Sequence, residues 1–406
     1  MIFIGSIYQK AYENEILKFS NVGLANADNT LQYNIIGGIE ENLNETLKII
    51  NVPNIGSYPK LYKKIILKST GWKHRELSND TQVGTFNLPI LKHIIIYRKL
   101  KKTIINELKY GIKHENIIIY STYLPFLKAI YKLNENYKVT LIVTDLPELY
   151  NNAKVNFIKN IFLKLSYKMV YKNISRVDSF VLLTEQMKDP LKVGNRPYVI
   201  IEGMVNHQTT IDDKEKDYNC YNKKIILYTG GLHYSYGIKN LLEAFKLISY
   251  KDYELWICGS GEAESEIVNL SKNDRRIKFY GYLSKEEVEK LQKQSTILIN
   301  PRTNDGEYNK YSFPSKTMEY MLTGKPVVMY KLDGIPDEYD EYLYYINGNK
   351  AVDIASKIIE ICGKSEEERN KVGEKVRKFV MERKNNVVQA EKIMKMILEN
   401  HNENNC

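Results

Sequence analysis

The stretch that decides the fold spans residues 312–328 and has the sequence SFPSKTMEYMLTGKPVV. Pro314 suits the first position of a helix, where its missing N–H costs nothing. Gly324 suits the left-handed residue that ends a helix, and Pro326 keeps the helix from continuing. Val327–Met329 then begins an apolar run. We therefore predict a short helix that leads directly into a buried strand.

The first turn of this helix carries a lysine, Lys316. The dipole of a helix N-terminus disfavours a cation, so this lysine is explained if an anion such as a diphosphate binds the free backbone N–H groups there. Glu319, about one turn further on, is placed to accept hydrogen bonds from neutral hydroxyls such as those of a ribose. The alternative is an ordinary surface helix with a solvated Lys316 and Glu319.

Length and cysteine usage limit the class of protein. A chain of 406 residues predicts about two to three domains. The four cysteines are far apart and form no CxxC pair, which argues against a zinc site or a disulfide framework and fits a reducing cytoplasm. No run of about 18 apolar residues and no signal-peptide pattern occur, so we expect a cytoplasmic protein without a transmembrane helix.

The positive charge lies in the first half of the chain. Residues 1–200 hold 28 Lys and Arg against 16 Asp and Glu, whereas residues 201–406 hold 31 against 33. A basic half indicates an anionic partner, which could be a nucleic acid, an anionic membrane surface or a phosphorylated substrate. The basic runs are Lys60–Lys68, Tyr97–Lys102 and Lys154–Lys172.

The last basic run has a helical pattern with two different faces. Its apolar residues at helical spacing are Ile158, Ile161, Phe162, Leu165 and Met169. Its lysines fall mostly on another face, at Lys154, Lys164, Lys168 and Lys172. Such a pattern is typical of a helix that lies on anionic lipid. A helix that packs its apolar face into the core and leaves its lysines in water gives the same pattern.

Strands and helices alternate along both halves of the chain. In the first half we predict strands at Ile2–Ile4, Tyr33–Ile36, Asn116–Tyr120, Val139–Val143, Ser179–Leu183 and Tyr198–Ile201, and helices at Ile90–Leu108, Pro125–Leu133 and Lys154–Asn173. In the second half we predict strands at Lys224–Tyr228, Tyr253–Cys258, Ile277–Phe279, Thr296–Ile299 and Pro326–Tyr330, with helices between them. This alternation predicts two doubly wound α/β domains with parallel sheets, facing each other across a cleft.

Several turns of the second half are expected on one rim. Ligands of doubly wound sheets bind at the carboxyl ends of the strands. That edge would carry the turns Gly230-Gly231, Gly259-Ser260-Gly261, Gly281-Tyr282 and Pro301-Arg302, and the helix that contains Lys316. A nicotinamide-dependent dehydrogenase is excluded because no GxGxxG opens a helix after a strand. The basic runs also lack the interleaved aromatic residues of single-strand nucleic-acid binders.

The second half resembles the donor-binding domain of a GT-B glycosyltransferase, specifically of the retaining family 4 and of the type that assembles bacterial polysaccharides. The matching segments follow the family's order at residues 226–232, 241–245, 255–262, 277–283 and 314–328. The resemblance covers roughly residues 140–395. It implies an acceptor-binding domain at 1–206, a linker at 207–223, a donor-binding domain at 224–385 and a helix at 386–406 that packs back on the first domain.

The resemblance also implies roles for individual residues. Glu319 would hold the ribose hydroxyls of a sugar nucleotide, and the backbone near Tyr282 and Leu283 would meet the base. The glycine turn at Gly230-Gly231 would let the backbone approach the diphosphate. Gly259, Pro314 and Ser315 complete the expected donor contacts.

This chain departs from the family pattern at the diphosphate. Many members carry an arginine after the first glycine and a lysine five residues later, where this chain has Gly231 and Tyr236. Lys316 and Arg302 are our candidates for the missing positive charge, although Arg302 could equally be a surface arginine. His233, after the glycine turn, is a candidate for a phosphate contact or for a structural role.

Two positions near the expected reaction centre also differ from the pattern. Tyr311 replaces the first glutamate of the family's Glu-x7-Glu pattern, and Asp305 or Glu307 are the substitutes nearby. Thr144 stands where many members have a histidine, followed by Asp145. Asp145 could serve as a base or hydroxyl anchor on the acceptor side, or it could only shape the turn before Leu-Pro.

The implied function is transfer of a hexose from a nucleoside-diphosphate sugar, expected to be a UDP-sugar, to an acceptor hydroxyl with retention, in the synthesis of capsule, exopolysaccharide or O-antigen. Lys316 and Glu319 would be catalytic, with Asp145. No cofactor and no metal are expected, because the cationic rim can stabilise the leaving diphosphate. The partners would be a glycan or lipid-linked acceptor and, through the basic half, the inner face of the cell membrane, but no nucleic acid. The alternatives are a sugar-nucleotide epimerase or hydrolase of the same architecture and a non-enzymatic anion-binding protein.

Overall fold

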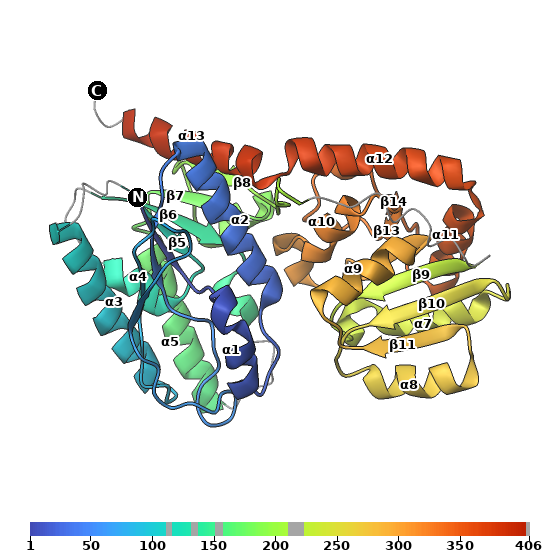
Figure 1. Ribbon diagram of the computed structural model, residues 1–406, viewed down its shortest axis with the longest axis horizontal. Coiled ribbons are helices and arrows are strands. Elements are labelled where there is room, and N and C mark those ends of the chain that lie inside the picture. The colour runs from blue at the N-terminus through green and yellow to red at the C-terminus, as the bar shows by residue number, and fades with distance from the viewer. Residues whose placement is uncertain (111–115, 131–136, 151–156, 210–222, 403–406) are drawn as a thin grey trace. The chain divides into compact units, whose positions relative to one another are not determined.

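The computed structural model describes residues 1–110, 116–130, 137–150, 157–209 and 223–402 (Figure 1). The chain divides into two compact units. Unit 1 is Met1–Glu202 together with Asn386–Cys406, and unit 2 is Gly203–Asn385. Most of the linker expected at residues 207–223 lies outside the described residues.

Unit 1 is built on a sheet whose described strands lie in the order β3-β4-β2-β1-β5-β6-β7-β8. The strands are β1 (Ile2–Gly5), β2 (Lys48–Asn51), β3 (Thr70–Trp72), β4 (Asp80–Gln82), β5 (Asn116–Tyr120), β6 (Lys138–Val143), β7 (Ser179–Leu182) and β8 (Tyr198–Ile200). All neighbours are parallel except the pair β3 and β4. The central strands are apolar runs buried on both faces, as expected for a parallel sheet covered by helices.

The longer helices of unit 1 cover both faces of this sheet (Figure 1). They are α1 (Glu13–Phe19), α2 (Asn26–Leu43), α3 (Leu91–Tyr110), α4 (Leu124–Ile130), α5 (Phe157–Ile174), α6 (Lys188–Leu191) and α13 (Asn386–Asn402). α13 packs against α2 and also contacts β7 and β8. The end of the predicted helix Pro125–Leu133, from residue 131, and the start of Lys154–Asn173, up to residue 156, lie outside the described residues.

The predicted strand Tyr33–Ile36 is wrong, because these residues lie inside α2. The two isoleucines before Gly37-Gly38 imitate a strand that ends in a turn. In the structure these glycines serve a close helix contact instead. A Cβ atom on Gly38 would lie 2.1 Å from the backbone oxygen of Asn386, at the start of α13. The small residues are therefore needed for helix packing, which a local pattern does not reveal.

Unit 2 has a six-stranded parallel sheet in the order β11-β10-β9-β12-β13-β14 within the described residues. The strands are β9 (Lys224–Thr229), β10 (Tyr253–Cys258), β11 (Ile277–Gly281), β12 (Ile297–Asn300), β13 (Val327–Met329) and β14 (Tyr344–Tyr345). This is a doubly wound order: successive strands are added on one side of β9 as far as β11, and then on its other side from β12 onward. The predicted alternation of the second half is therefore confirmed.

The helices of unit 2 begin and end where the sequence marks them. They are α7 (Ile238–Leu247), α8 (Glu264–Asn273), α9 (Lys285–Gln294), α10 (Ser315–Leu322), α11 (Ala351–Gly363) and α12 (Glu366–Arg383). Ser284 caps α9 by accepting a hydrogen bond from the Glu287 N–H, and Ser365 caps α12 in the same way with Glu368. Such reciprocal caps satisfy backbone donors that the helix itself leaves open.

The short helix predicted between Pro314 and Gly324 is α10. Its first helical residue is Ser315, so Pro314 stands one position earlier than predicted, as the N-cap. Gly324 has a φ of 70°, the left-handed conformation expected of a residue that ends a helix. The buried strand β13 follows at Val327.

Candidate functional site

The candidate site lies at the carboxyl edge of the unit 2 sheet, where β9 and β12 are neighbours. Gly230 follows β9, Gly259 follows β10, and Pro301 follows β12. The crevice outside this switch in strand order is where open α/β sheets bind ligands.

Glycines allow the backbones at this edge to approach each other closely. A Cβ atom on Gly259 would lie 1.8 Å from the carbonyl oxygen of Gly230, and Gly259 has a φ of 142°. A Cβ atom on Gly237 would lie 2.0 Å from the carbonyl oxygen of Pro301. No side chain fits at either point without a shift of the backbone.

Two buried tyrosines hold the turn after β9. The Tyr228 hydroxyl donates to the carbonyl oxygen of Gly231 at 2.7 Å. The Tyr320 hydroxyl of α10 accepts from the Thr229 N–H at 2.9 Å and donates to the Thr229 carbonyl at 3.1 Å. Burial raises the pKa of both tyrosines, so their hydroxyls keep their protons. Tyr320 therefore joins α10 to the end of β9, a contact that the sequence analysis did not foresee.

The turn after β9 leaves a backbone donor open. The N–H groups of Gly230 and Leu232 donate to the carbonyls of Cys258 and Ser260 at 3.0 and 2.9 Å. Between them, the Gly231 N–H has no hydrogen-bond partner among the described residues. An open N–H group between two fixed ones is suited to an anionic oxygen.

Arg302 lies against two tyrosine rings just after β12. Its guanidinium carbon is 5.5 Å from the ring centre of Tyr236 and 4.6 Å from that of Tyr308. Nε donates to Asn309 Oδ1 at 2.7 Å, and Nη2 donates to the Ser312 hydroxyl at 3.0 Å. In the described part of the chain, Nη1 has no hydrogen-bond partner. The guanidinium is thus held in place with donors still available.

Asn309 organises the loop that carries Arg302. Its side chain is fully buried, and Nδ2 donates to the carbonyls of Thr303 and Asp305 at 3.0 and 3.1 Å. The sequence analysis missed Asn309, because no local motif connects it with Arg302. Asp305 and Glu307 are both exposed. Tyr311 is half-buried at the end of the short helix Glu307–Tyr311.

Lys316 and Glu319 form an ion pair on α10. Lys316 Nζ lies 3.0 and 2.8 Å from the two carboxylate oxygens of Glu319. Gln292, at the end of α9, donates through Nε2 to Glu319 Oε1 at 2.7 Å. Gln292 is buried, whereas the two charged side chains are about one-third exposed. Gln292 therefore orients the carboxylate, and the sequence analysis had not named it.

Lys316 is also close to the end of β10. Burial raises the pKa of the Cys258 thiol, and the positive charge of Lys316 opposes this shift. Cys258 directly precedes Gly259, so α10 and the glycine turns share one edge of the sheet. The first helical N–H groups of α10, those of Ser315 and Lys316, have no partner in the described residues.

The remaining predicted contacts of unit 2 lie on the same edge. Tyr282 directly follows β11 and is 65% exposed, and Leu283 comes next. The His233 ring meets the Tyr236 ring edge to face at 5.3 Å. The structure thus brings the glycine turns, Arg302 and α10 together at one rim.

Asp145 belongs to unit 1, unlike the other predicted site residues. It is half-buried and, together with the buried Thr144, directly follows the strand β6.

The turn after β1 in unit 1 is held by buried side-chain amides. Gln32 accepts from the Ser6 N–H at 2.8 Å, Asn51 from the Ile7 N–H at 2.7 Å, and Asn29 from the Tyr8 N–H at 2.8 Å. These are three successive backbone donors, and each has a protein partner.

A charged network in unit 1 joins α2 to β4. His74 lies 2.7 Å from both Glu40 and Asp80, and Arg75 lies 2.8 Å from Glu40. Burial alone would lower the pKa of His74, but hydrogen bonds and charge from Asp80 and Glu40 outweigh it and raise the pKa to about 9. The imidazolium therefore bridges two carboxylates at neutral pH.

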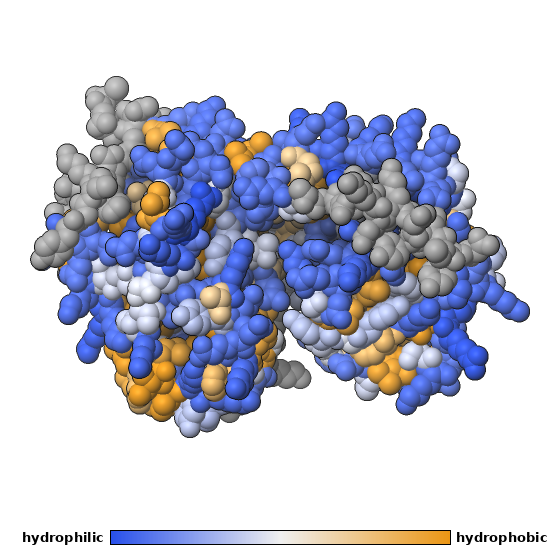
Figure 2. Space-filling model, viewed as in Figure 1, coloured by the Kyte–Doolittle hydropathy of each residue, from blue (hydrophilic) through white to orange (hydrophobic). Residues whose placement is uncertain are grey.

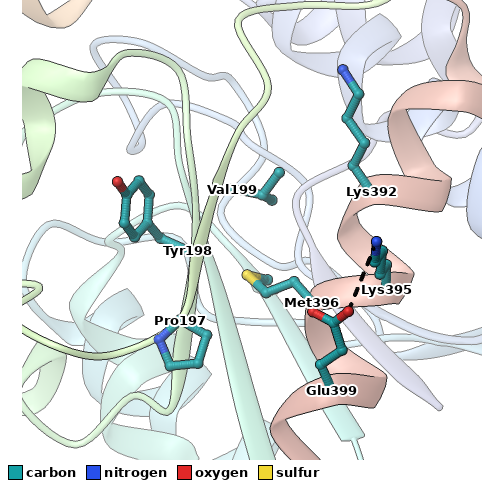
Figure 3. A pocket seen from close by; sticks show the side chains of 7 residues that line it. All are labelled: Pro197, Tyr198, Val199, Lys392, Lys395, Met396 and Glu399. Atoms are coloured by element: carbon teal, nitrogen blue, oxygen red, sulfur yellow. Dashed lines mark ion pairs between the residues drawn. The ribbon is translucent and has the colours of Figure 1, made fainter.

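A pocket of about 350 Å³ lies in unit 1 beside β8 (Figure 3). Its lining residues are Pro197, Tyr198, Val199, Lys392, Lys395, Met396 and Glu399. Lys395 and Glu399 pair at 3.9 Å along α13. None of the predicted site residues lines this pocket.

No three His, Cys, Asp or Glu side chains among the described residues gather in a way that could hold a metal ion. In this part of the chain, no helix combines the length and the apolar character that crossing a bilayer requires.

Comparison of the sequence with protein families gives one match. Residues 210–379 match the family described as glycosyl transferases group 1. These residues make up most of unit 2. No curated protein sequence matches significantly.

Comparison of the structure gives many matches, and the three described here have low sequence identity. Sucrose-phosphate synthase from Thermosynechococcus elongatus has a TM-score of 0.67 at 14% identity, with 98% of each chain covered. The lipopolysaccharide outer core galactosyltransferase WaaB has a TM-score of 0.62 at 14% identity, with coverage of 98% and 99%. HepE from Anabaena, in complex with UDP and glucose, has a TM-score of 0.61 at 11% identity, with 98% of each chain covered. The chain therefore has the two-domain GT-B fold.

Proposed function

We propose that this protein is a hexosyltransferase of the retaining family 4, which moves a sugar from a nucleoside-diphosphate sugar to an acceptor hydroxyl. The observation that carries the proposal is the placement of Arg302 against Tyr236. Arg302 would thereby supply a cation near the open Gly231 N–H, in place of the lysine that many members of the resembled family carry at the position of Tyr236. The match of residues 210–379 to glycosyl transferases group 1 supports the same activity.

In the proposed reaction the bond between the anomeric carbon and the diphosphate oxygen breaks, and the electron pair leaves with the diphosphate. A bond from the acceptor oxygen to the same carbon forms, and the hydroxyl proton is transferred to a base. Arg302, Lys316 and the N-terminus of α10 would stabilise the charge that develops on the diphosphate. Asp145 is our candidate for the acceptor side, as base or hydroxyl anchor. This scheme needs no cofactor beyond the sugar nucleotide.

The donor would lie along the carboxyl edge of the unit 2 sheet. Glu319, oriented by Gln292, would accept hydrogen bonds from the ribose hydroxyls. Exposed Tyr282 and the backbone at Leu283 would contact the base. The diphosphate would meet the turns at Gly230, Gly231 and Gly259 and the start of α10 at Pro314 and Ser315.

The donor is proposed to be a UDP-sugar and the product a bacterial cell-surface polysaccharide. Two structural neighbours support this choice, since HepE was solved with UDP and glucose and WaaB is described as a lipopolysaccharide galactosyltransferase. The acceptor would be a glycan or a lipid-linked saccharide, and we place the enzyme in the cytoplasm, on the inner face of the membrane.

Thermal shift and donor turnover with UDP-, GDP-, ADP- and TDP-sugars test this proposal. We expect one nucleotide to raise the melting temperature of the wild type but not of Glu319→Ala. The matched control is Glu374→Ala, which removes an exposed carboxylate on α12 and should respond like the wild type. If no sugar nucleotide stabilises the wild type, sugar transfer is ruled out. Donor turnover that no acceptor accelerates would indicate a hydrolase or epimerase instead.

A further inference from the structure

Unit 1 exposes large apolar side chains on two of its helices. They are Ile90, Leu91 and Ile94 at the start of α3, and Ile161, Phe162, Leu165 and Met169 on α5. We call these seven residues the α3–α5 surface. Phe162 is 68% exposed and Ile90 is 76% exposed. Apolar residues scattered singly on a surface are ordinary, but several large ones gathered together indicate a binding surface.

The apolar stripe of α5 does not face the core of the unit. Its residues are spaced by one, three and four positions and so share one helical face. The residues of α5 that are buried are Val170, Asn173 and Ile174. Of the two alternatives for this stripe, packing into the core is therefore contradicted for the part of the helix that the structure describes. Ile158 and Lys154 lie outside the residues whose side chains are described.

The two helices start on the same side of the unit. α3 follows β4 and α5 follows β6, and both strands run parallel to the central strands of the sheet. Helix α4 contacts both α3 and α5. Figure 2 shows apolar side chains gathered at the lower end of unit 1, where Figure 1 places the first turns of these helices. The α3–α5 surface is therefore one region and not two distant ones.

The exposed charged side chains of α3 and α5 themselves are positive, and one neighbouring carboxylate, Glu148, accepts from the Tyr171 hydroxyl of α5 at 2.7 Å. Lys164, Lys168 and Lys172 of α5 are all exposed, and α5 contains no acidic residue between Phe157 and Ile174. On α3, the exposed cations are Arg98, Lys99, Lys102 and, near its end, Lys109. A partner that complements this region must offer apolar material together with negative charge. An acyl-chain boundary beneath anionic headgroups has both properties.

We propose that the α3–α5 surface docks unit 1 onto a bilayer that contains anionic lipid. Phe162 and Leu165 enter the boundary between headgroups and acyl chains, and Lys164 and Lys168 contact lipid phosphates. Docking itself is independent of the proposed function, because it requires no sugar nucleotide. One consequence rests on the proposed function: if sugar transfer is correct, a docked enzyme favours an acceptor carried on lipid.

Co-sedimentation of the full chain with vesicles tests the proposal. We expect binding to vesicles of phosphatidylglycerol and phosphatidylcholine, weakening as salt is raised, and little binding to phosphatidylcholine alone. Lys164→Gln with Lys168→Gln should weaken partition by about 25-fold, since each surface lysine contributes roughly fivefold. Phe162→Ser with Leu165→Ser should weaken it by at least about tenfold.

Matched controls come from unit 2. Leu247→Ser removes an exposed leucine of α7, and Lys375→Gln with Lys378→Gln removes two exposed lysines of α12. These should bind vesicles like the wild type, and all variants should keep the wild-type melting temperature because the side chains are exposed. Absent binding by the wild type, equal binding to neutral vesicles, or unchanged binding by both α5 variants would overturn the proposal. So would a self-association without vesicle binding that Phe162→Ser abolishes, because the surface would then join two copies. Because no nucleotide is added, failure here is distinct from failure of the donor assay.

Discussion

The turn after β1 in unit 1 and the turn after β9 in unit 2 occupy the same place in two doubly wound sheets, yet they are held in opposite ways. Buried amides from Gln32, Asn51 and Asn29 take up successive N–H groups after β1. After β9, glycines let one backbone turn rest directly on another. Only the second arrangement leaves a backbone donor open among the described residues.

This difference indicates which turn can bind an anion. A turn whose N–H groups are saturated by protein side chains is a support and cannot bind a phosphate without losing hydrogen bonds. The tyrosine hydroxyls that hold the turn after β9 bind Thr229 and the Gly231 carbonyl, so the Gly231 N–H keeps no partner among the described residues. Arg302 and the start of α10 then add positive charge beside this turn. The two turns should therefore fail in different ways when they are mutated.

The largest effect is expected for Gly259→Ala. Its new Cβ atom would lie 1.8 Å from the Gly230 carbonyl oxygen, so the backbone turns must separate. We expect unit 2 to lose more than about 4 kcal/mol of stability, together with all nucleotide binding. Hydrogen-exchange mass spectrometry should show the loss in unit 2 peptides. Gly281→Ala, at a φ of 67° with open space around it, should cost only about 1 kcal/mol.

Asn51→Leu breaks the corresponding turn of unit 1. The Asn51 amide accepts from the Ile7 N–H at 2.7 Å and donates to the Ile7 carbonyl at 2.9 Å. Leucine leaves both buried groups unpaired, at a total cost of about 3 kcal/mol in urea unfolding. At temperatures where the Asn51→Leu variant is still folded, unit 2 should bind nucleotide as in the wild type. The control Asn21→Leu changes an exposed residue and should alter stability by less than about 1 kcal/mol. An equal loss of stability in both variants would contradict the role of Asn51 in holding the turn after β1.

Arg302→Gln removes a positive charge from the rim of unit 2 and keeps a polar side chain there. If the proposed function is correct, kcat/KM should fall roughly 100- to 1000-fold, because a donor proposed to stabilise the developing diphosphate charge would be lost. Arg302→Lys should recover part of the rate, since it keeps the charge without the bonds to Asn309 and Ser312. Steady-state kinetics with the donor found in the thermal-shift panel measure kcat/KM for both Arg302 variants. A fall of the same size in Lys375→Gln would show that the effect is not local.

The His74 network should make the stability of unit 1 depend on pH. The pKa of His74 is raised to about 9, against about 6.5 when unfolded. Its stabilising contribution is therefore complete below about pH 6.5 and is lost as pH rises through about 9. Wild type should exceed His74→Gln by on the order of 2 kcal/mol near pH 6, and the gap should close by about pH 10. A gap that stays constant in urea titrations across this range would disprove the charged network.

The smallest effect is expected for Gln292→Leu. The variant keeps Glu319 and Lys316 but removes the bond that orients the carboxylate. We expect KM for the donor to rise roughly tenfold with little change in kcat, because uniform binding is lost. The wild type should also prefer the ribose donor over its deoxy analogue more strongly than the variant does. An unchanged preference would mean that Gln292 has only a packing role.

The fold could be predicted largely from the sequence because strand and helix boundaries in unit 2 carry local marks. Ser284 with Glu287, and Gly324 with Pro326, each specify a helix end by chemistry within a few residues. Gly37-Gly38 misled the prediction because its partner, α13, is more than 340 positions away in the chain.

The candidate site was less accessible to sequence reasoning. The turns on the rim could be placed by topology alone, since parallel strands end at a common edge. The contact of Arg302 with Tyr236 depends on a loop shaped by buried Asn309, and no spacing rule connects these three residues. Likewise, the pattern of α5 shows that it has an apolar face but not whether that face meets protein or water.

The packing of α13 on α2 has a consequence for biosynthesis. The backbone of Asn386 rests on Gly38, so unit 1 is complete only when a segment made at the far end of translation arrives. At about 5 to 20 residues per second, a ribosome needs roughly 20 to 70 seconds to proceed from the end of α2 to the start of α13. During that interval the face of α2 around Gly38 lacks its packing partner, and a premature stop codon before residue 386 would remove that partner permanently.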